Sequence, residues 1–206
     1  MSGSRVDTTT KERLIIEAMR LFSQQGYRAT SVKQIEQAAG LVPGCGALYN
    51  HFKSKQELLT AVIDRQLDRR RAMHDISALF AGRGDLRTEL SLLCRYLMSV
   101  LDQESEFLQV VARTPADESP RLTDAYAALI DGLYSELRDW IKACASTPDL
   151  AEAGRIAAVG IDALVGRRTS RIVFHANQID TIDEQYVSEW TAMIACRIEH
   201  QSRPAN

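Results

Sequence analysis

Hydrophobic residues recur at intervals of three and four along almost the whole chain, and this spacing places them on one face of an α-helix. The pattern is first clear after Thr9, where Leu14, Ala18 and Phe22 share a face. Similar stripes follow with short breaks until the last few residues, and no stretch alternates convincingly as a β-strand would. The pattern predicts an all-α protein.

Start signals divide this pattern into separate helices. A Ser or Thr followed three residues later by Glu or Gln forms a capping box, in which each side chain satisfies a backbone N–H. The capping pairs are Thr9 with Glu12, Ser31 with Gln34, Ser54 with Glu57 and Thr181 with Glu184, and hydroxyl residues precede Pro120 and Pro148. We expect about nine helices, over residues 9–22, 31–39, 44–51, 54–80, 85–103, 104–113, 121–145, 148–177 and 184–200.

Residues 30–55 combine two short helices with a tight turn. The helix that begins at Ser31 should be about two turns long, because Gly40 suits the left-handed position that ends a helix. Pro43 cannot continue a helix, so the chain turns there before a second short helix that ends near His51. This arrangement is a helix-turn-helix, whose second helix enters the major groove of DNA.

Short motifs follow one another here in a specific order. They are Gly26-Tyr27, Thr30-Ser31, Ile35, Ala38-Ala39-Gly40, Leu48-Tyr49-Asn50-His51-Phe52 and Lys53-Ser54-Lys55. Together they resemble the DNA-binding domain of TetR-family transcriptional regulators. The resemblance covers roughly a quarter of the chain, and the rest matches the family only in length and helical pattern.

The resemblance implies two domains and a set of contact residues. Residues 1–53 would form the DNA-binding helix-turn-helix domain, with residues 1–9 as a disordered arm, and residues 54–206 would form a helical bundle for ligand binding and dimerisation. The positions expected to contact or frame operator DNA are Thr30, Ser31, Lys33, Gly44, Cys45, Gly46, Ala47, Tyr49, Asn50, His51, Lys53 and Lys55.

The turn departs from the family pattern. Family members commonly have a segment such as Ser-Lys-Gly-Thr before the Leu-Tyr pair, whereas this chain has a segment about two residues longer, Val42 to Ala47. Its side chains carry no group that reads bases in a bidentate way, so we expect sparse direct readout. Specificity would then rest on the first helix, on apolar contacts to thymine methyl groups or on DNA shape. A positive φ at Gly44 would let the turn set the docking angle.

Charge is distributed unevenly along the chain. The formal net charge is −2, but residues 1–71 hold 12 Lys and Arg against 7 Asp and Glu. A mildly basic N-terminal part suits contact with phosphates, although many ordinary domains carry such an excess. No run of eighteen apolar residues occurs, and residues 1–10 lack the apolar core of a signal peptide. We expect a cytoplasmic protein without a membrane partner.

The cysteines and histidines do not indicate a metal or another cofactor. Cys45, Cys94, Cys144 and Cys196 are scattered without CxxC spacing, and reduced buried thiols are the expected state. Cys45 is the exception, because a place at the start of the recognition helix would lower its pKa. The sequence also lacks a Gly-rich phosphate loop and a nucleophile elbow, so an enzyme is a remote alternative.

Apolar faces of the middle helices offer candidate positions for an effector pocket, although most such positions in proteins are plain core. Arg95 and Arg113 lie within mostly apolar runs, and a buried guanidinium needs an anionic partner, either an internal carboxylate or the ligand. The candidate pocket residues are Cys94, Arg95, Met98, Phe107, Arg113, Tyr126, Ile130, Tyr134 and Trp140.

By the same resemblance, the last two long helices pair with those of a second copy as a four-helix bundle. Gly160 and Ala163 are small enough to let helices approach closely. The alternative is that this face packs inside the monomer. The candidate dimer residues are Ile156, Val159, Gly160, Ala163, Leu164, Arg167, Trp190, Met193, Ile194 and Arg197.

These expectations describe a DNA-binding transcriptional regulator, a homodimeric repressor released from a pseudo-palindromic operator by an unknown small-molecule effector. Effector binding would tilt the helix that begins at Ser54 and so change the separation of the two recognition helices. A transcriptional activator and an effector-independent DNA-binding scaffold are the alternatives. The effector, the operator and the regulated genes do not follow from the sequence.

Overall fold

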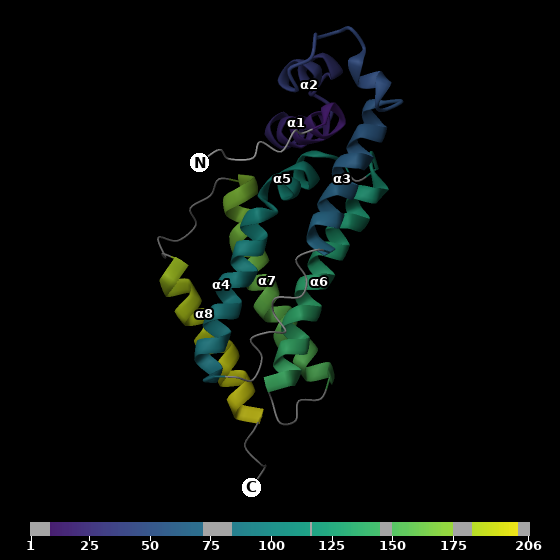
Figure 1. Cartoon of the computed structure of the whole chain (residues 1–206). Coiled ribbons are helices and arrows are strands. Elements are labelled where there is room, and N and C mark those ends of the chain that lie inside the picture. The colour runs from purple at the N-terminus through teal and green to yellow at the C-terminus, as the bar shows by residue number, and fades with distance from the viewer. Residues whose placement is uncertain (1–8, 72–83, 116, 145–149, 175–182, 202–206) are drawn as a thin grey trace, which may run out of the picture. The chain divides into compact units, whose positions relative to one another are not determined.

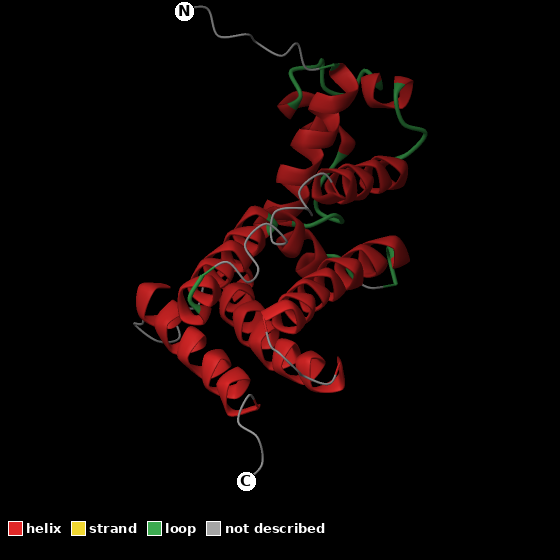
Figure 2. Ribbon diagram, turned by 60° about the horizontal axis from the view of Figure 1, so that its bottom comes forward, coloured by secondary structure: helices red, strands yellow, loops and turns green. Residues whose placement is uncertain are grey.

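The computed structural model describes residues 9–71, 84–115, 117–144, 150–174 and 183–201. These residues form eight α-helices and one 3₁₀ helix, joined by loops (Figures 1 and 2). The helices are α1 (Thr10–Gln25), α2 (Val32–Ala38), η1 (Ala47–Asn50), α3 (Lys55–Arg71), α4 (Leu86–Gln103), α5 (Ser105–Arg113), α6 (Pro120–Cys144), α7 (Leu150–Phe174) and α8 (Asp183–Gln201). No strand occurs in the described ranges, so the all-α expectation is confirmed.

One helix differs from its prediction. The segment expected to be a helix from residue 44 or 45 to His51 is a single 3₁₀ turn, Ala47–Asn50. Gly46 has the left-handed conformation at the N-cap, and two further glycines with positive φ, Gly40 and Gly44, keep the preceding chain out of helical geometry. The second helix of the helix-turn-helix is therefore short.

The chain divides into two compact units that each combine distant segments. The first comprises residues 1–70 and 106–125, and the second comprises residues 71–105 and 126–206. Helix α5 and the start of α6 thus belong with the N-terminal helices. The boundary after residue 53 expected from the family resemblance stays a prediction, because it separates functions and these units separate contacts.

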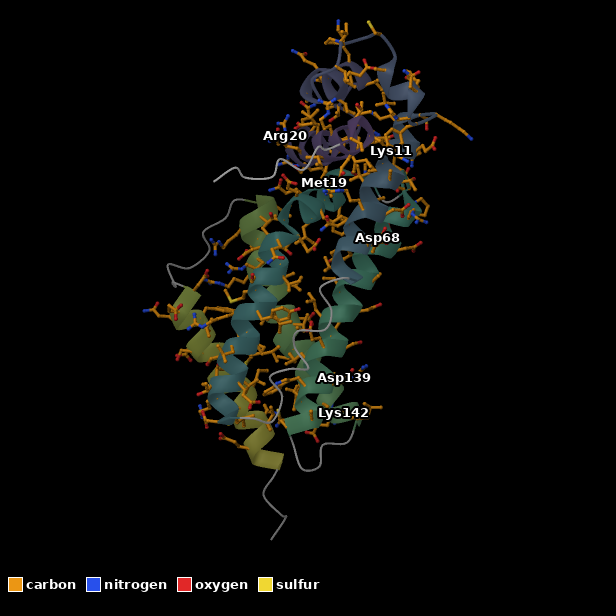
Figure 3. All side chains as sticks on the ribbon, in the orientation of Figure 1. Lys11, Met19, Arg20, Asp68, Asp139 and Lys142 are labelled. Carbon is orange, nitrogen blue, oxygen red and sulfur yellow. The ribbon has the colours of Figure 1, made fainter. Side chains whose placement is uncertain are left out.

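The core of the first unit is built on the apolar face of α1. Leu14, Ala18 and Phe22 are completely buried there, as their spacing predicts. The rings of Phe22 and Tyr27 meet edge to face with their centroids 5.2 Å apart. The Lys11 ammonium, whose side chain is labelled on α1 in Figure 3, lies 5.6 Å from the centroid of the Phe52 ring.

The caps predicted from sequence form at four starts in this unit, among them Ser119 before Pro120, whose hydroxyl accepts a hydrogen bond from the Leu122 N–H at 3.3 Å. The Thr9 hydroxyl accepts a hydrogen bond from the Glu12 N–H, and the Ser54 hydroxyl accepts one from the Glu57 N–H. The Glu57 carboxylate accepts the Lys53 N–H, one residue before the predicted partner. The remaining start, at Ser31, belongs to the interface described below. Thr181 and the start before Pro148 lie outside the described residues.

Helix α5 and the turn after it are fastened to the N-terminal helices by polar contacts. The Arg113 guanidinium donates hydrogen bonds to the carbonyls of Ser23 and Gln24, in the last turn of α1. It therefore caps carbonyls that the helix itself leaves without partners. Glu118 forms an ion pair with Arg28 at 2.9 Å, and its carbonyl accepts a hydrogen bond from the Gln56 side chain at 3.3 Å.

In the second unit α4 packs against α7 and α8, and these three helices lie side by side in Figure 1. Helices α7 and α8 contact each other at Gly160, whose carbonyl accepts a hydrogen bond from the buried Trp190 Nε1 at 2.9 Å. A Cβ at this position would lie 3.0 Å from Leu137 and 3.2 Å from Ile194. These distances are tighter than ordinary van der Waals contact, so a larger residue would require the neighbouring side chains to shift. No helix in the described ranges has the length and apolar character required to cross a membrane.

The buried guanidinium of this unit is that of Arg168, which is 4% exposed. It lies 3.1 Å from the carboxylates of both Asp102 and Asp183, and Asp183 also contacts Arg167 and Arg171. Although burial by itself raises the pKa of Asp183, hydrogen bonds from Arg167 and Arg168 bring it below the usual value. Internal carboxylates thus neutralise most of this buried charge.

Glycines on α7 provide a test of this packing. We expect Gly160→Val to lower the free energy of unfolding by about 1–3 kcal/mol, because the added atoms overpack the contact between α7 and α8. Gly154→Ala in the same helix meets nothing within 4 Å and should raise it by about 0.5–1 kcal/mol. Urea unfolding followed by circular dichroism measures both, and equal midpoints for the two variants would contradict this account.

Candidate nucleic-acid interface

Helix α2 begins with a complete capping box. The Ser31 hydroxyl accepts a hydrogen bond from the Gln34 N–H at 3.2 Å, and the Gln34 side-chain oxygen accepts one from the Ser31 N–H at 2.8 Å. Thr30 is buried, and its hydroxyl donates to the Gly26 carbonyl at 2.8 Å. Ser31 is therefore available at the surface, whereas Thr30 fixes the chain between α1 and α2.

Three glycines shape the turn after α2. The angle φ is +72° at Gly40, +81° at Gly44 and +73° at Gly46, a region that residues with a Cβ rarely adopt. The positive φ expected for Gly44 is confirmed. A β-branched residue at any of these positions would strain the turn.

The turn is tied to α2 by Glu36, which is completely buried. One carboxylate oxygen accepts the Gly44 N–H at 2.7 Å and the other accepts the Leu48 N–H at 3.0 Å. Hydrogen bonds to a carboxylate are stronger than those between neutral groups. The sequence analysis missed this residue. A signal was present, because Glu36 stands four residues after Val32 and three before Ala39, on the apolar stripe of α2.

Helix η1 is anchored by one side chain and presents others to solvent. Leu48 is completely buried, whereas Tyr49, Asn50 and His51 are exposed. Tyr49 is 57% exposed, a large fraction for an aromatic residue. Outward-facing polar and aromatic groups on a short helix after a turn are suited to contact with a DNA groove.

The structure assigns Lys55 a different role from the predicted phosphate contact. Its ammonium donates to the carbonyls of Tyr27 and Thr30, both at 2.8 Å, and lies 4.2 Å from the centroid of the Tyr27 ring. Burial lowers the pKa of Lys55, partly offset by Glu118. Three internal contacts occupy the donors of this ammonium, so its geometry favours a structural role.

Other predicted contact residues lie at the surface of the first unit. Lys33 on α2 and Lys53 before α3 are exposed, and Cys45 is exposed in the turn. Gly46 and Ala47 are half-buried at the start of η1. Gly46 separates Cys45 from that helix, so Cys45 does not occupy the predicted helix start.

The predicted pocket residues are divided between the two units. Phe107 and Arg113 belong to the first unit, and the other seven belong to the second. Cys94, Met98, Phe107 and Trp140 are buried, and Tyr126, Ile130 and Tyr134 are half-buried. Burial raises the pKa of the Cys94 thiol to about 12, which is typical of an inert core thiol.

The two arginines expected to be buried are exposed. Arg95 forms an ion pair with Glu184, so the internal carboxylate expected as its partner is present, but the pair lies at the surface. Arg113 has backbone carbonyls as its partners. The buried guanidinium belongs instead to Arg168, whose two aspartate partners come from other helices.

Half of the residues proposed for a dimer interface are buried within the chain. Ile156, Gly160, Leu164, Trp190 and Ile194 pack inside the second unit, so they have no surface to offer a second copy. The alternative of packing inside the monomer is correct for these five. Val159, Met193 and Arg197 are exposed, and Ala163 and Arg167 are half-buried.

Comparison with known proteins identifies the N-terminal region. Residues 14–62 match the family described as bacterial regulatory proteins, tetR family. This match shows that residues 14–62 resemble the corresponding region of TetR-family regulators. The matched residues include α2, the turn, η1 and the first half of α3, and therefore the whole arrangement around Glu36.

Curated relatives of this chain share mainly that region. YvkB of Bacillus subtilis, an uncharacterized HTH-type transcriptional regulator, is 29% identical over 52% of this chain and 53% of its own length. The HTH-type transcriptional repressor ComR of Escherichia coli is 36% identical over 44% of this chain and 41% of its own length. The chain spans about half, or less, of the length of these relatives.

Solved structures extend the likeness in fold to nearly the whole chain. Reduced NemR of E. coli has a TM-score of 0.59 at 20% identity and covers 92% of this chain and 97% of its own. A TetR-family regulator from Mesorhizobium loti has a TM-score of 0.65 at 19% identity and covers 96% of each chain. At such identities the likeness establishes the fold alone.

Lys55 and Lys33 provide a matched pair for testing the structural role of the half-buried Lys55 ammonium. We expect Lys55→Ala to lower the free energy of unfolding by about 2 kcal/mol, because two carbonyls lose their donor. Lys33→Ala changes an exposed residue and should alter it by less than about 0.5 kcal/mol. Chemical unfolding measures both values, and equal stability of the two variants would argue against this role.

Proposed function

We propose that this protein is a transcriptional regulator that binds a pseudo-palindromic DNA operator as a homodimer. The observation that carries the proposal is the coincidence of the family match at residues 14–62 with a rigid helix-turn-helix. Its outer side offers Tyr49, Asn50 and His51 for a groove. Lys33 and Lys53 flank it as candidates for phosphate contacts.

A dimer would place two such units in successive major grooves, about 34 Å apart along the duplex. Because the proposed ligand is operator DNA, we also propose that the protein acts in the compartment that holds the chromosome. The names of several relatives describe repressors, among them ComR and KstR2. Repression is therefore the direction of regulation that we propose, with activation as the alternative.

The surface that we propose for the dimer lies on α7 and α8. Val159 is 58% exposed and Met193 is 43% exposed, and both are large apolar side chains on helices whose neighbouring residues pack together. Exposed apolar side chains of this size are candidates for an interface. Half-buried Ala163 and exposed Gly166 add small positions along α7 that would permit close helix approach.

We propose further that a small-molecule effector controls DNA binding. Helix α5 and the start of α6 pack with the DNA-binding helices in one compact unit, and Arg113 joins α5 to the end of α1. A change in the position of α5 would therefore act on the helix-turn-helix directly. The effector-independent scaffold is the alternative, and a thermal-shift screen of small apolar and anionic compounds separates the two, because a ligand stabilises the folded state by mass action.

DNA binding is tested by selecting an operator from a random library and measuring affinity against salt concentration. For the wild type we expect tight, salt-dependent binding. Lys33→Ala or Lys53→Ala should each reduce the slope of log K against log salt by about 0.9 per protomer, hence by about 1.8 for a dimer. Lys142→Ala on α6, labelled in Figure 3, is the control and should leave the slope unchanged. Failure to select any sequence would reject the proposed function.

The dimer is tested at Val159 and Met193. We expect the double variant Val159→Glu with Met193→Glu to sediment as a monomer at micromolar concentration, because four carboxylates would face one another across the twofold axis. Leu92→Glu on α4, which changes a side chain of similar exposure, is the matched control and should leave the dimer intact. A double variant that sediments as a dimer would place the interface elsewhere.

A further inference from the structure

The turn between α2 and η1 presents apolar side chains to solvent. Val42 is 66% exposed, and Pro43 and Cys45 are also exposed. We call these three residues the apolar edge. No side chain from Val42 to Ala47 can donate or accept a bidentate hydrogen bond. This edge therefore has no means of reading the polar edge of a base pair in the usual way.

The backbone contacts of the edge indicate that it is held in one conformation. The Glu36 carboxylate accepts the N–H groups of Gly44 and Leu48, on either side of Cys45. Within the turn the Cys45 N–H donates to the Val42 carbonyl at 3.4 Å. These hydrogen bonds fix the backbone of the turn without requiring its apolar side chains to be buried. Val42 and Cys45 are therefore exposed but held in one position.

The surroundings of the edge indicate what it meets. Lys33 and Lys53 are exposed cations of the same matched region, and Tyr49 and Asn50 are exposed on the helix that follows the turn. An apolar edge in a region that also exposes cations suits a polyanion that displays apolar groups between its charges. In the DNA major groove the C5 methyl of thymine is that group.

We propose that the apolar edge reads thymine methyl groups in each operator half-site, and that Glu36 is the positioning residue that holds the edge in place. The inference rests on the proposed function and adds how a half-site is recognised. Because the turn is about two residues longer than the family pattern and η1 is a single turn, this edge replaces part of the reading surface of a longer recognition helix.

The first experiment replaces single thymines of the selected operator by uracil, which removes only the methyl group. We expect one or two positions per half-site at which affinity falls about fourfold, and about 15-fold when both half-sites are changed. Val42→Ser should bind the thymine and uracil operators with equal affinity at those positions. If every uracil operator binds the wild type as tightly as its thymine counterpart, the edge does not read methyl groups.

The second experiment tests Glu36 with Glu36→Gln, which keeps the size of the side chain but replaces one acceptor oxygen by a donor NH₂. We expect this variant to keep its helical circular-dichroism spectrum and its salt slope, while the ratio of affinities for thymine and uracil operators falls towards one. An unchanged ratio would reject the positioning role. Should Glu36→Gln fail to fold, Glu36 has a structural role only, and the uracil and Val42→Ser measurements still decide whether the edge reads methyl groups.

The two proposals fail in different ways. A wild-type protein that selects no DNA sequence rejects the regulator itself. A wild-type protein that selects an operator, but is indifferent to thymine methyl groups within it, leaves the regulator standing and rejects only the apolar edge. Recognition through DNA shape is the interpretation that this second result would support.

Discussion

A buried carboxylate that must find hydrogen-bond donors is the constraint on which the candidate nucleic-acid interface depends. Removing a charged group from water costs several kcal/mol or more unless hydrogen bonds replace the lost hydration. The Glu36 carboxylate on α2 accepts hydrogen bonds from two backbone N–H groups, those of Gly44 and Leu48. The same bonds satisfy amides of a segment that has no helix or sheet partner. The same two hydrogen bonds thus satisfy both the buried carboxylate and the two backbone amides. They also tie the turn to α2.

Local chemistry explains which parts of the fold are predictable from sequence. A capping box is complete within four residues, so the starts of α1, α2 and α3 follow from Thr9, Ser31 and Ser54 alone. Proline and glycine likewise act on their own backbone torsions, which is why the turn and the sign of φ at Gly44 are predictable. The length of η1 is not predictable in this way, because Gly46 permits a helix to begin but does not determine where it ends.

The remaining differences arise where a residue's role depends on distant neighbours. Lys55 shares its position with family residues at the DNA surface, yet the carbonyls of residues 27 and 30 surround its ammonium here. Periodicity shows that Gly160 lies on an apolar face but not that Trp190 of the same chain covers it. Arg95 lies in an apolar run and Arg168 in a polar one, yet the folded arrangement of α4, α7 and α8 buries Arg168 and leaves Arg95 exposed.

The hydrogen bonds between α5 and α1 have a consequence for how the first unit could be exchanged between related proteins. The first unit is discontinuous in sequence, since residues 106–125 belong to it together with the first seventy. A chimera cut after α3 would leave the last carbonyls of α1 facing whichever residue the recipient carries in place of Arg113. Exchanging the first unit of this chain between proteins therefore requires that both of its segments be transferred together. A single gene fragment that ends after α3 does not encode the whole first unit of this molecule.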